Sequence, residues 1–270
     1  MNTEQAKQLS EDALNRLMDA LDRGESDTLK LYLKTMARFH RYSAMNCLLI
    51  ISQCPTATHV AGYQTWRKLG RQVLKGAKGI AILAPMVGRK KSDEQLAADE
   101  QTRLFGFRAA HVFDVSATSG ADLPAFATVQ GDPCEYTARL KAFVTCKGIA
   151  LEYSDDIAPA KGLCSGKAIK LLPSLSPGEE FSVLVHEFAH SDLHFGDRRQ
   201  ETTKTIRETE AEAVAFVVSE AVGLETNTSA SDYILTHRGD RATLAESLAF
   251  IQRTATEILD AILPDRPSPS

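Results

Sequence analysis

The C-terminal half of the chain contains the sequence His186-Glu187-Phe188-Ala189-His190, an HExxH pattern inside a segment whose apolar periodicity predicts a helix over 178–195. A spacing of four residues places both imidazoles on one face of a helix, about one turn apart, so both can bind a single ion. Glu187 can take a proton from a water molecule and later transfer it to a leaving group. The pattern predicts a mononuclear hydrolytic site for Zn²⁺, which suits imidazole ligands, with Mn²⁺ or another divalent ion as the alternative.

A catalytic zinc needs a third protein ligand and one open coordination position. The next expected helix, over 202–222, offers three carboxylates: Glu208, Glu210 and Glu212. Glu208 follows His190 by 18 residues, enough to turn and pack a second helix against the first. Glu208 and Glu212 project from the same face. The alternative interpretation is an ordinary acidic helix face. The position just after HExxH and the neighbouring apolar residues, Ala211, Ala213, Val214 and Phe216, favour the metal site.

This second helix resembles that of gluzincin-type peptidases, which carries a ligand glutamate and, four residues later, an acidic or amide side chain. Their E-x-E-A-D and E-x-E-A-N patterns align with Glu208, Glu210, Ala211 and Glu212. The resemblance implies that Glu208 is the metal ligand and that Glu212 is a hydrogen-bond acceptor that orients a ligand histidine.

Hydrolysis of an acyl group also needs a hydrogen-bond donor for the tetrahedral oxyanion. Tyr233 and His237 lie in a loop that could return to the site and are candidates for this role. His194, four residues beyond His190, is a candidate fourth ligand or oxyanion donor. An exposed histidine at the helix end is the favoured interpretation of that residue.

Charge divides the chain in two. Residues 1–130 carry a net charge of +4 and residues 131–270 a net charge of −8, and residues 30–91 contain 12 Lys or Arg and no acidic residue. A solvated surface normally mixes both signs, so this segment predicts an anionic partner.

Aromatic residues interleave with these cations, and flat rings can stack on unpaired bases while cations neutralise phosphates. No helix-turn-helix is evident, so single-stranded DNA is a better fit than a duplex. The alternative is that Phe39, Tyr63 and Trp66 are core residues and that the lysines are merely solvated. The candidate DNA-binding residues are Arg38, Arg41, Tyr42, Asn46, Tyr63, Trp66, Arg67, Lys68, Arg71, Lys75 and Lys78.

The elements that must position these residues suggest an α+β protein of two domains, 1–130 and 131–270, divided near Gly131-Asp132-Pro133. Periodicity and turn residues predict further helices over 4–23, 27–39, 44–53, 134–148 and 240–263. They predict strands over 59–66, 72–74, 79–83, 105–115, 149–153 and 167–172, and a loop over 88–103.

The N-terminal half resembles the N-terminal domain of ArdC-like antirestriction proteins. The similar segments are 41–50, 62–66, 70–76, 79–85 and 112–115, beginning with Arg41-Tyr42-Ser43-Ala44-Met45-Asn46. The resemblance implies a mixed domain of helices and short sheets that binds single-stranded DNA, followed by a zincin-like metallopeptidase domain. The family's Glu-Glu-Leu-Val-Ala-Glu segment corresponds to residues 207–212, where Glu208 and Glu212 match and Glu210 does not.

Five cysteines without a CxxC pair indicate reduced thiols, and no apolar run approaches the roughly 20 residues of a membrane span. These features, and the absence of a signal-peptide profile, predict a cytoplasmic protein with no membrane partner.

The leading hypothesis is an antirestriction-type protein of a mobile element, which binds incoming single-stranded DNA and carries a zinc peptidase site for an unknown protein substrate. Two alternatives stay open at this point. One is a non-enzymatic DNA protector with a structural metal, and the other is a peptidase that cleaves a repressor.

Overall fold

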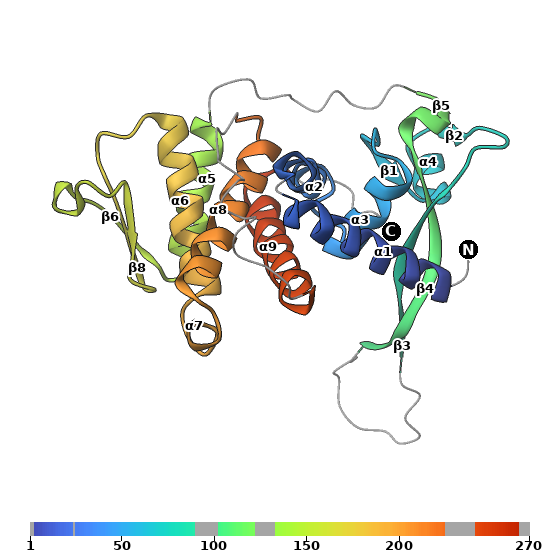
Figure 1. Cartoon of the computed structure of the whole chain (residues 1–270). Coiled ribbons are helices and arrows are strands. Elements are labelled where there is room, and N and C mark those ends of the chain that lie inside the picture. The colour runs from blue at the N-terminus through green and yellow to red at the C-terminus, as the bar shows by residue number, and fades with distance from the viewer. Residues whose placement is uncertain (1–2, 24, 90–101, 122–132, 225–240, 265–270) are drawn as a thin grey trace, which may run out of the picture. The chain divides into compact units, whose positions relative to one another are not determined.

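The structure is a computed structural model that describes residues 3–23, 25–89, 102–121, 133–224 and 241–264. It confirms a mixed α+β fold with several helices and small sheets (Figure 1). None of the described helices combines the length and apolar character needed to cross a membrane.

The described residues form two compact units that do not follow the sequence order. The first unit contains residues 3–13 and 48–121, and the second contains residues 14–47, 133–224 and 241–264. Helix α2 (Ser26–Arg38) belongs to the second unit because its buried side chains Leu29, Leu33 and Met36 lie in a core shared with α8 (Lys204–Ala221). The contacts therefore group residues 14–47 with the C-terminal residues, a division different from a boundary near residue 130.

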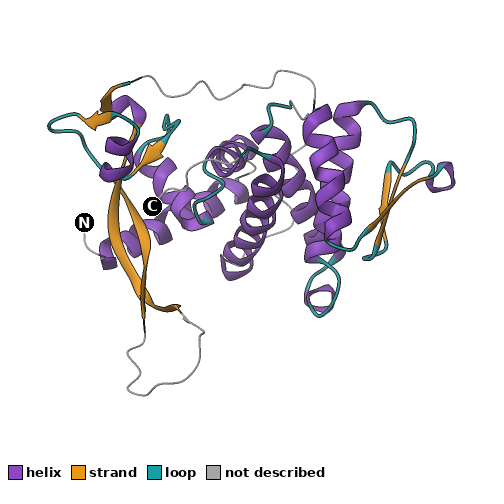
Figure 2. Ribbon diagram, turned by 180° about the vertical axis from the view of Figure 1, so that it is seen from behind, coloured by secondary structure: helices purple, strands orange, loops and turns teal. Residues whose placement is uncertain are grey.

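The first unit is built around a long antiparallel hairpin of β3 (Ile80–Arg89) and β4 (Thr102–Asp114), seen as the extended ribbon in Figure 2. Strand β1 (Val60–Ala61) extends this sheet in the order β1-β4-β3, and β2 (Arg71–Val73) pairs with β5 (Thr118–Gly120). A 3-10 turn (Val115–Ala117) separates β4 from β5.

Helix α4 (Tyr63–Lys68) occupies part of the segment where the sequence predicts a strand over 59–66. That prediction is wrong beyond residue 61. Trp66, 2% exposed, explains the helix, because its ring enters the core and its Nε1 donates a hydrogen bond of 2.9 Å to the Phe113 carbonyl. Helix α3 (Ala44–Gln53) follows the prediction, and α1 (Thr3–Asp22) contributes residues to both units.

The second unit is mainly helical. Helix α6 (Pro177–Leu193) packs against α8 and α5 (Cys134–Cys146), and α9 (Arg241–Ile262) packs against α8 and α5 (Figure 1). The facing side chains are large and fully buried, including Phe181 and Phe188 on α6, which fits the apolar stripes of these helices.

A three-stranded sheet in the order β6-β8-β7 lies beside α6, through contacts of β7 and β8. Its strands are β6 (Ala150–Tyr153), β7 (Gly162–Cys164) and β8 (Ala168–Leu171), with a 3-10 turn at Asp155–Ile157. Strands β6 and β8 are parallel, and β7 is antiparallel to β8. The sequence predicts β6 and β8 but not β7, which places an edge strand next to the HExxH helix.

Local sequence explains where the two site helices begin. Helix α6 starts at Pro177 behind a capping box, in which Ser176 and Glu179 exchange hydrogen bonds between side chain and backbone. The Thr203 hydroxyl caps α8 by accepting from the Ile206 N–H at 3.2 Å. A short helix, α7 (Arg198–Glu201), which the sequence does not predict, lies between them.

Candidate metal centre

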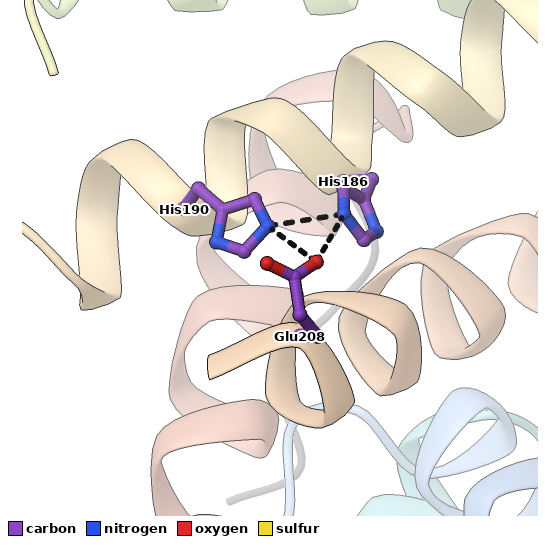
Figure 3. Close-up of side chains that lie close together, drawn as sticks. All are labelled: His186, His190 and Glu208. Carbon is purple, nitrogen blue, oxygen red and sulfur yellow. Dashed lines mark hydrogen bonds and ion pairs between the residues drawn. The ribbon is translucent and has the colours of Figure 1, made fainter. Parts of the chain in front are cut away.

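Helix α6 presents His186 and His190 one turn apart, as their spacing predicts. Their Nε2 atoms lie 3.1 Å from each other and point to one place beside α8 (Figure 3). The side chains are 22% and 15% exposed, so the site is reachable from solvent while its walls hold the rings in place.

Glu208, near the start of α8, completes the group. Its Oε2 lies 3.4 Å from His190 Nε2 and 3.7 Å from His186 Nε2 (Figure 3). Among the described residues, these three side chains are the group whose ligand atoms all lie within 4.8 Å of one another. Two imidazole nitrogens and one carboxylate oxygen around one point fit a divalent cation and leave further coordination positions open.

The three side chains shift one another's pKa values. Although burial lowers it, the pKa of His186 is raised to about 9 by hydrogen bonds to Glu208 and Glu212. Burial and the charge of His186 lower the pKa of His190 to about 4, and the hydrogen bond from His186 lowers the pKa of Glu208 to about 2. Without a metal at neutral pH, His186 is therefore protonated on both ring nitrogens, and a cation must displace its Nε2 proton.

Glu187 lies on the wall of the same pocket and is 8% exposed. Burial raises the pKa of its carboxyl, and the neighbouring positive charge of His186 opposes that shift. A carboxylate whose pKa is moved toward neutrality can both accept and return a proton, as a general base requires. Its position is fixed by β7, because a Cβ atom on Gly162 would lie 2.6 Å from Glu187 Oε1.

Glu212 lies where an orienting acceptor is predicted, with its Oε2 3.3 Å from His186 Nδ1. A carboxylate at Nδ1 fixes the ring tautomer that presents Nε2 to a metal. The other predicted accessory residues, Tyr233 and His237, lie outside the described residues.

His194 corrects the sequence interpretation, which favours an exposed histidine at the helix end. The residue is 1% exposed, its Nδ1 lies 3.0 Å from His190 Nδ1, and its Nε2 lies 2.9 Å from Glu210 Oε2. Glu210 is itself fully buried and bonded to Arg198 and Ser247. This buried chain, His190–His194–Glu210, is a feature that the sequence does not predict. The third histidine at the same four-residue spacing is the signal that could have identified it.

The pocket around these residues has a volume of about 520 Å³. Its lining comes from β7 and from residues in or next to α6, α7 and α8. It is lined by Ala160, Gly162, Leu163, Cys164, His186, Glu187, His190, His194, Phe195, Arg199, Lys204, Arg207 and Glu208.

The predicted DNA-binding residues do not form a single group, because they divide between the two units. Arg38, Arg41, Tyr42 and Asn46 belong to the second unit, and the seven from Tyr63 to Lys78 belong to the first. The exposed members of the set are Arg38, Tyr63, Arg67, Lys68, Lys75 and Lys78.

Several members of the set have structural roles. Trp66 is a core residue in this structure, so its ring is not available for base stacking, and Asn46 is also buried. Burial raises the pKa of Tyr42 to about 12, and Arg41 Nε lies 3.1 Å from Asp260 Oδ1. Arg71 donates to Thr118 and so joins β2 to β5.

Two exposed aromatic side chains on β4 are absent from the predicted set. Phe105 is 60% exposed and Phe107 is 46% exposed, comparable with Tyr63 at 44%. Their alternation along a predicted strand is the signal that could have identified them.

The N-terminal segment of the chain matches a known protein family. Residues 7–113 match the family model of the N-terminal domain of the anti-restriction factor ArdC. This N-terminal segment is ArdC-like. Two solved structures share the fold over nearly the whole chain.

The first is the metal-free crystal structure of the antirestriction protein ArdC from plasmid R388. It has a TM-score of 0.57 and 17% identity, and the match covers 96% of this chain and 99% of that one. The second is the Mn(II)-bound structure of the same protein, with a TM-score of 0.56, 16% identity and the same coverage.

A Bacillus anthracis protein, the uncharacterized protein pXO2-81, is 24% identical over 310 aligned positions. The alignment includes 96% of this chain and 52% of that relative, so the chain spans about half of the relative's length.

Proposed function

We propose that this protein binds single-stranded DNA and hydrolyses peptide bonds at a divalent metal site, as an antirestriction-type protein of mobile DNA. The observation that carries the hydrolytic part is the convergence of His186, His190 and Glu208, with Glu187 beside them in one pocket. The crystal structure of R388 ArdC with Mn(II) supports a divalent ion, and the two imidazoles and one carboxylate suit Zn²⁺ equally. The second unit is accordingly a zincin-like peptidase domain.

A bound divalent ion would polarise the scissile carbonyl and make water more acidic. His186, His190 and Glu208 hold that ion, and Glu212 keeps Nε2 of His186 directed toward it. Glu187 accepts the proton of the attacking water and returns it to the leaving amine, for which its raised pKa suits it. Strand β7 offers a free edge beside Glu187 among the described strands, and a substrate peptide can pair with it as an added strand.

The DNA-binding part rests on the ArdC N-terminal domain match and on the charge of the first unit. Its described side chains between residues 48 and 121 include six cations, Arg67, Lys68, Arg71, Lys75, Lys78 and Arg108, against the single acid Asp114. Asp114 is buried and accepts backbone hydrogen bonds from Thr58 and His59, so it does not neutralise the surface. The exposed rings of Tyr63, Phe105 and Phe107 supply stacking surfaces in place of Trp66.

The deciding experiment is proteolysis by metal-loaded protein, native or Glu187→Gln, with and without a single-stranded oligonucleotide. Substrates are the chain itself, a disordered model protein and DNA-binding proteins. We expect the variant to lose about 10²- to 10⁴-fold in rate. Glu201→Gln, an exposed carboxylate on α7 that does not line the pocket, is the matched control and should cleave normally. Equal cleavage by native protein and Glu187→Gln would refute the role of Glu187.

A further inference from the structure

Three basic side chains line the pocket of the candidate metal centre: Arg199, Lys204 and Arg207. Arg207 is held in place by donating to the carbonyls of Arg199, at 3.1 Å, and Thr202. The Arg199 guanidinium lies 5.4 Å from the centre of the Phe195 ring. Among the described side chains, no carboxylate forms an ion pair with any of these three cations.

These unpaired cations are unusual for the C-terminal half, which carries a net charge of −8. Of its eleven basic residues with described side chains, six form ion pairs with carboxylates: Arg139, Lys141, Lys147, Lys161, Lys170 and Arg198. Of these eleven described residues, two outside the pocket, Lys167 and Arg253, also form no ion pair with a carboxylate. Arg253 lies over the Phe250 ring. Positive charge without a partner is therefore concentrated where the substrate must bind.

The charge balance of the pocket determines what it attracts. Its carboxylates, Glu187 and Glu208, are matched by a divalent ion, so the three cations remain as excess positive charge. Resting on the proposed peptidase function, we propose that the substrate is a polypeptide segment with acidic side chains close to the scissile bond. The acidic side chains face Arg199, Lys204 and Arg207, while the peptide backbone pairs with β7.

A peptide fits this pocket better than a nucleic-acid phosphate does. Leu163 and Phe195, which are 53% and 39% exposed, also line it and offer apolar contacts that a polypeptide can use. Phosphodiester hydrolysis commonly uses two metal ions about 4 Å apart. The described residues contain one group of metal-binding geometry, which fits a mononuclear peptidase site.

Binding can be measured without catalysis by using metal-loaded Glu187→Gln protein. The probes are fluorescein-labelled peptides of one length, with acidic positions kept, replaced by the matching amides, or replaced by lysine. We expect the acidic peptides to bind about ten-fold more tightly than the amide peptides, since several partly exposed ion pairs contribute. The preference should shrink as salt rises from about 0.05 to about 0.5 M.

Charge reversal locates the effect. Lys204→Glu has no described side-chain partner to disturb, and together with Arg199→Glu it should abolish or invert the preference. Lys167→Glu, an exposed and unpaired cation outside this pocket, is the matched control and should leave the preference intact.

Equal affinity for acidic and amide peptides, or an equal effect of Lys167→Glu, would overturn the inference. So would an oligonucleotide that binds this pocket in a Lys204-dependent way while peptides show no such dependence. Cleavage by native protein without a charge preference would overturn this inference alone. A charge preference in binding without any cleavage by native protein would instead refute the proposed hydrolysis alone, and would leave the pocket as a binding site for acidic polypeptides.

Discussion

Glu210 is a fully buried carboxylate two residues from the candidate ligand Glu208, and it faces away from the metal position. Burial raises its pKa, but hydrogen bonds from His194 and Ser247 and the charge of Arg198 more than offset this and leave the pKa lowered. An ionised Glu210 accepts the Nε2 proton of His194, and His194 Nδ1 then accepts from His190 Nδ1. The chain therefore favours the tautomer of His190 that directs its Nε2 lone pair at a metal.

His194→Ala removes the acceptor that orients His190. We expect metal affinity to fall about 10- to 100-fold, the usual cost of losing an orienting partner. Competition against a chelator of known affinity measures this without any substrate. Glu210→Gln, which keeps the shape but not the charge, should give a smaller loss in the same direction.

His111→Gln, an exposed histidine in the first unit, is the control for an imidazole removed elsewhere. A folded His194→Ala protein with native metal affinity would show that the buried chain serves only to stabilise the fold.

The sequence predicts the site residues whose relative positions are set by a single helix. The spacing of His186 and His190 fixes a shared face, and the structure places both there. The burial of His194 depends on α8 and α9 covering the end of α6, through Glu210 and Ser247, and no local pattern reports such packing. The burial of Trp66 is equally invisible in the local sequence, because its ring nitrogen bonds to the carbonyl of Phe113 on another element.

At the scale of elements, β7 packs closely against Glu187, the proposed general base. Gly162→Ala would place a methyl group 2.6 Å from both Glu187 Oε1 and Val183 Cγ1, so strand or helix must shift. We expect the free energy of unfolding to fall by about 1–3 kcal/mol, the usual cost of overpacking. We also expect any cleavage to slow by about 10²-fold because Glu187 is displaced.

Denaturant unfolding of the metal-free protein measures the stability effect. Gly178→Ala lies in the first turn of the same α6, and its new methyl group would come no nearer than 4.0 Å to Leu224, so it should cause no such loss. Equal stabilities of the Gly162 and Gly178 variants would contradict the close approach of β7 to α6.

The capping box makes the start of α6 sensitive to acid. Hydrogen bonds to Lys161 and Ser176 lower the pKa of Glu179 from 4.5 to about 2. Because the folded pKa lies below the ordinary value, the contribution is fully present above about pH 4.5 and is lost as pH falls through about 2. Ser176→Ala should lower the free energy of unfolding at about pH 7, and should lower it less as the pH falls within this window.

Urea unfolding at several pH values tests this dependence, with Ser119→Ala on the exposed face of β5 as the control. A cost of Ser176→Ala that stays constant down to about pH 2 would argue against a contribution from Glu179.

Most helices were predictable because their apolar periodicity spans several turns, as in α6, α8 and α9. The short elements were not. Strand β7 and helix α7 have three and four residues, too few to show a period, and tertiary contacts determine them. Strands β3 and β4 extend further into the 88–103 segment than its polar composition predicts, because each pairs with the other.

At the scale of the whole molecule, the two proposed activities use different residues and should separate. Lys75→Glu with Lys78→Glu should weaken single-stranded DNA binding. The slope of log affinity against log salt concentration should become shallower by about 0.7 for each phosphate that is no longer neutralised. Metal affinity should not change. Fluorescence anisotropy over a salt series measures the first quantity and chelator competition the second.

The reciprocal variant, Glu187→Gln, should bind DNA with native affinity. Loss of DNA binding in Glu187→Gln, or of metal affinity in the double lysine variant, would show that the two sites are not independent.

The membership of α2 in the second unit has a consequence for synthesis on the ribosome. The buried face of α2, with Leu29, Leu33 and Met36, finds its partner α8 only after residue 204 has been made, about 165 residues later. At roughly 5–20 residues per second, the nascent helix waits on the order of 8–33 s with this face uncovered. During that interval residues 48–121, the larger part of the first unit, are made, so they can begin to fold before α2 can dock on α8.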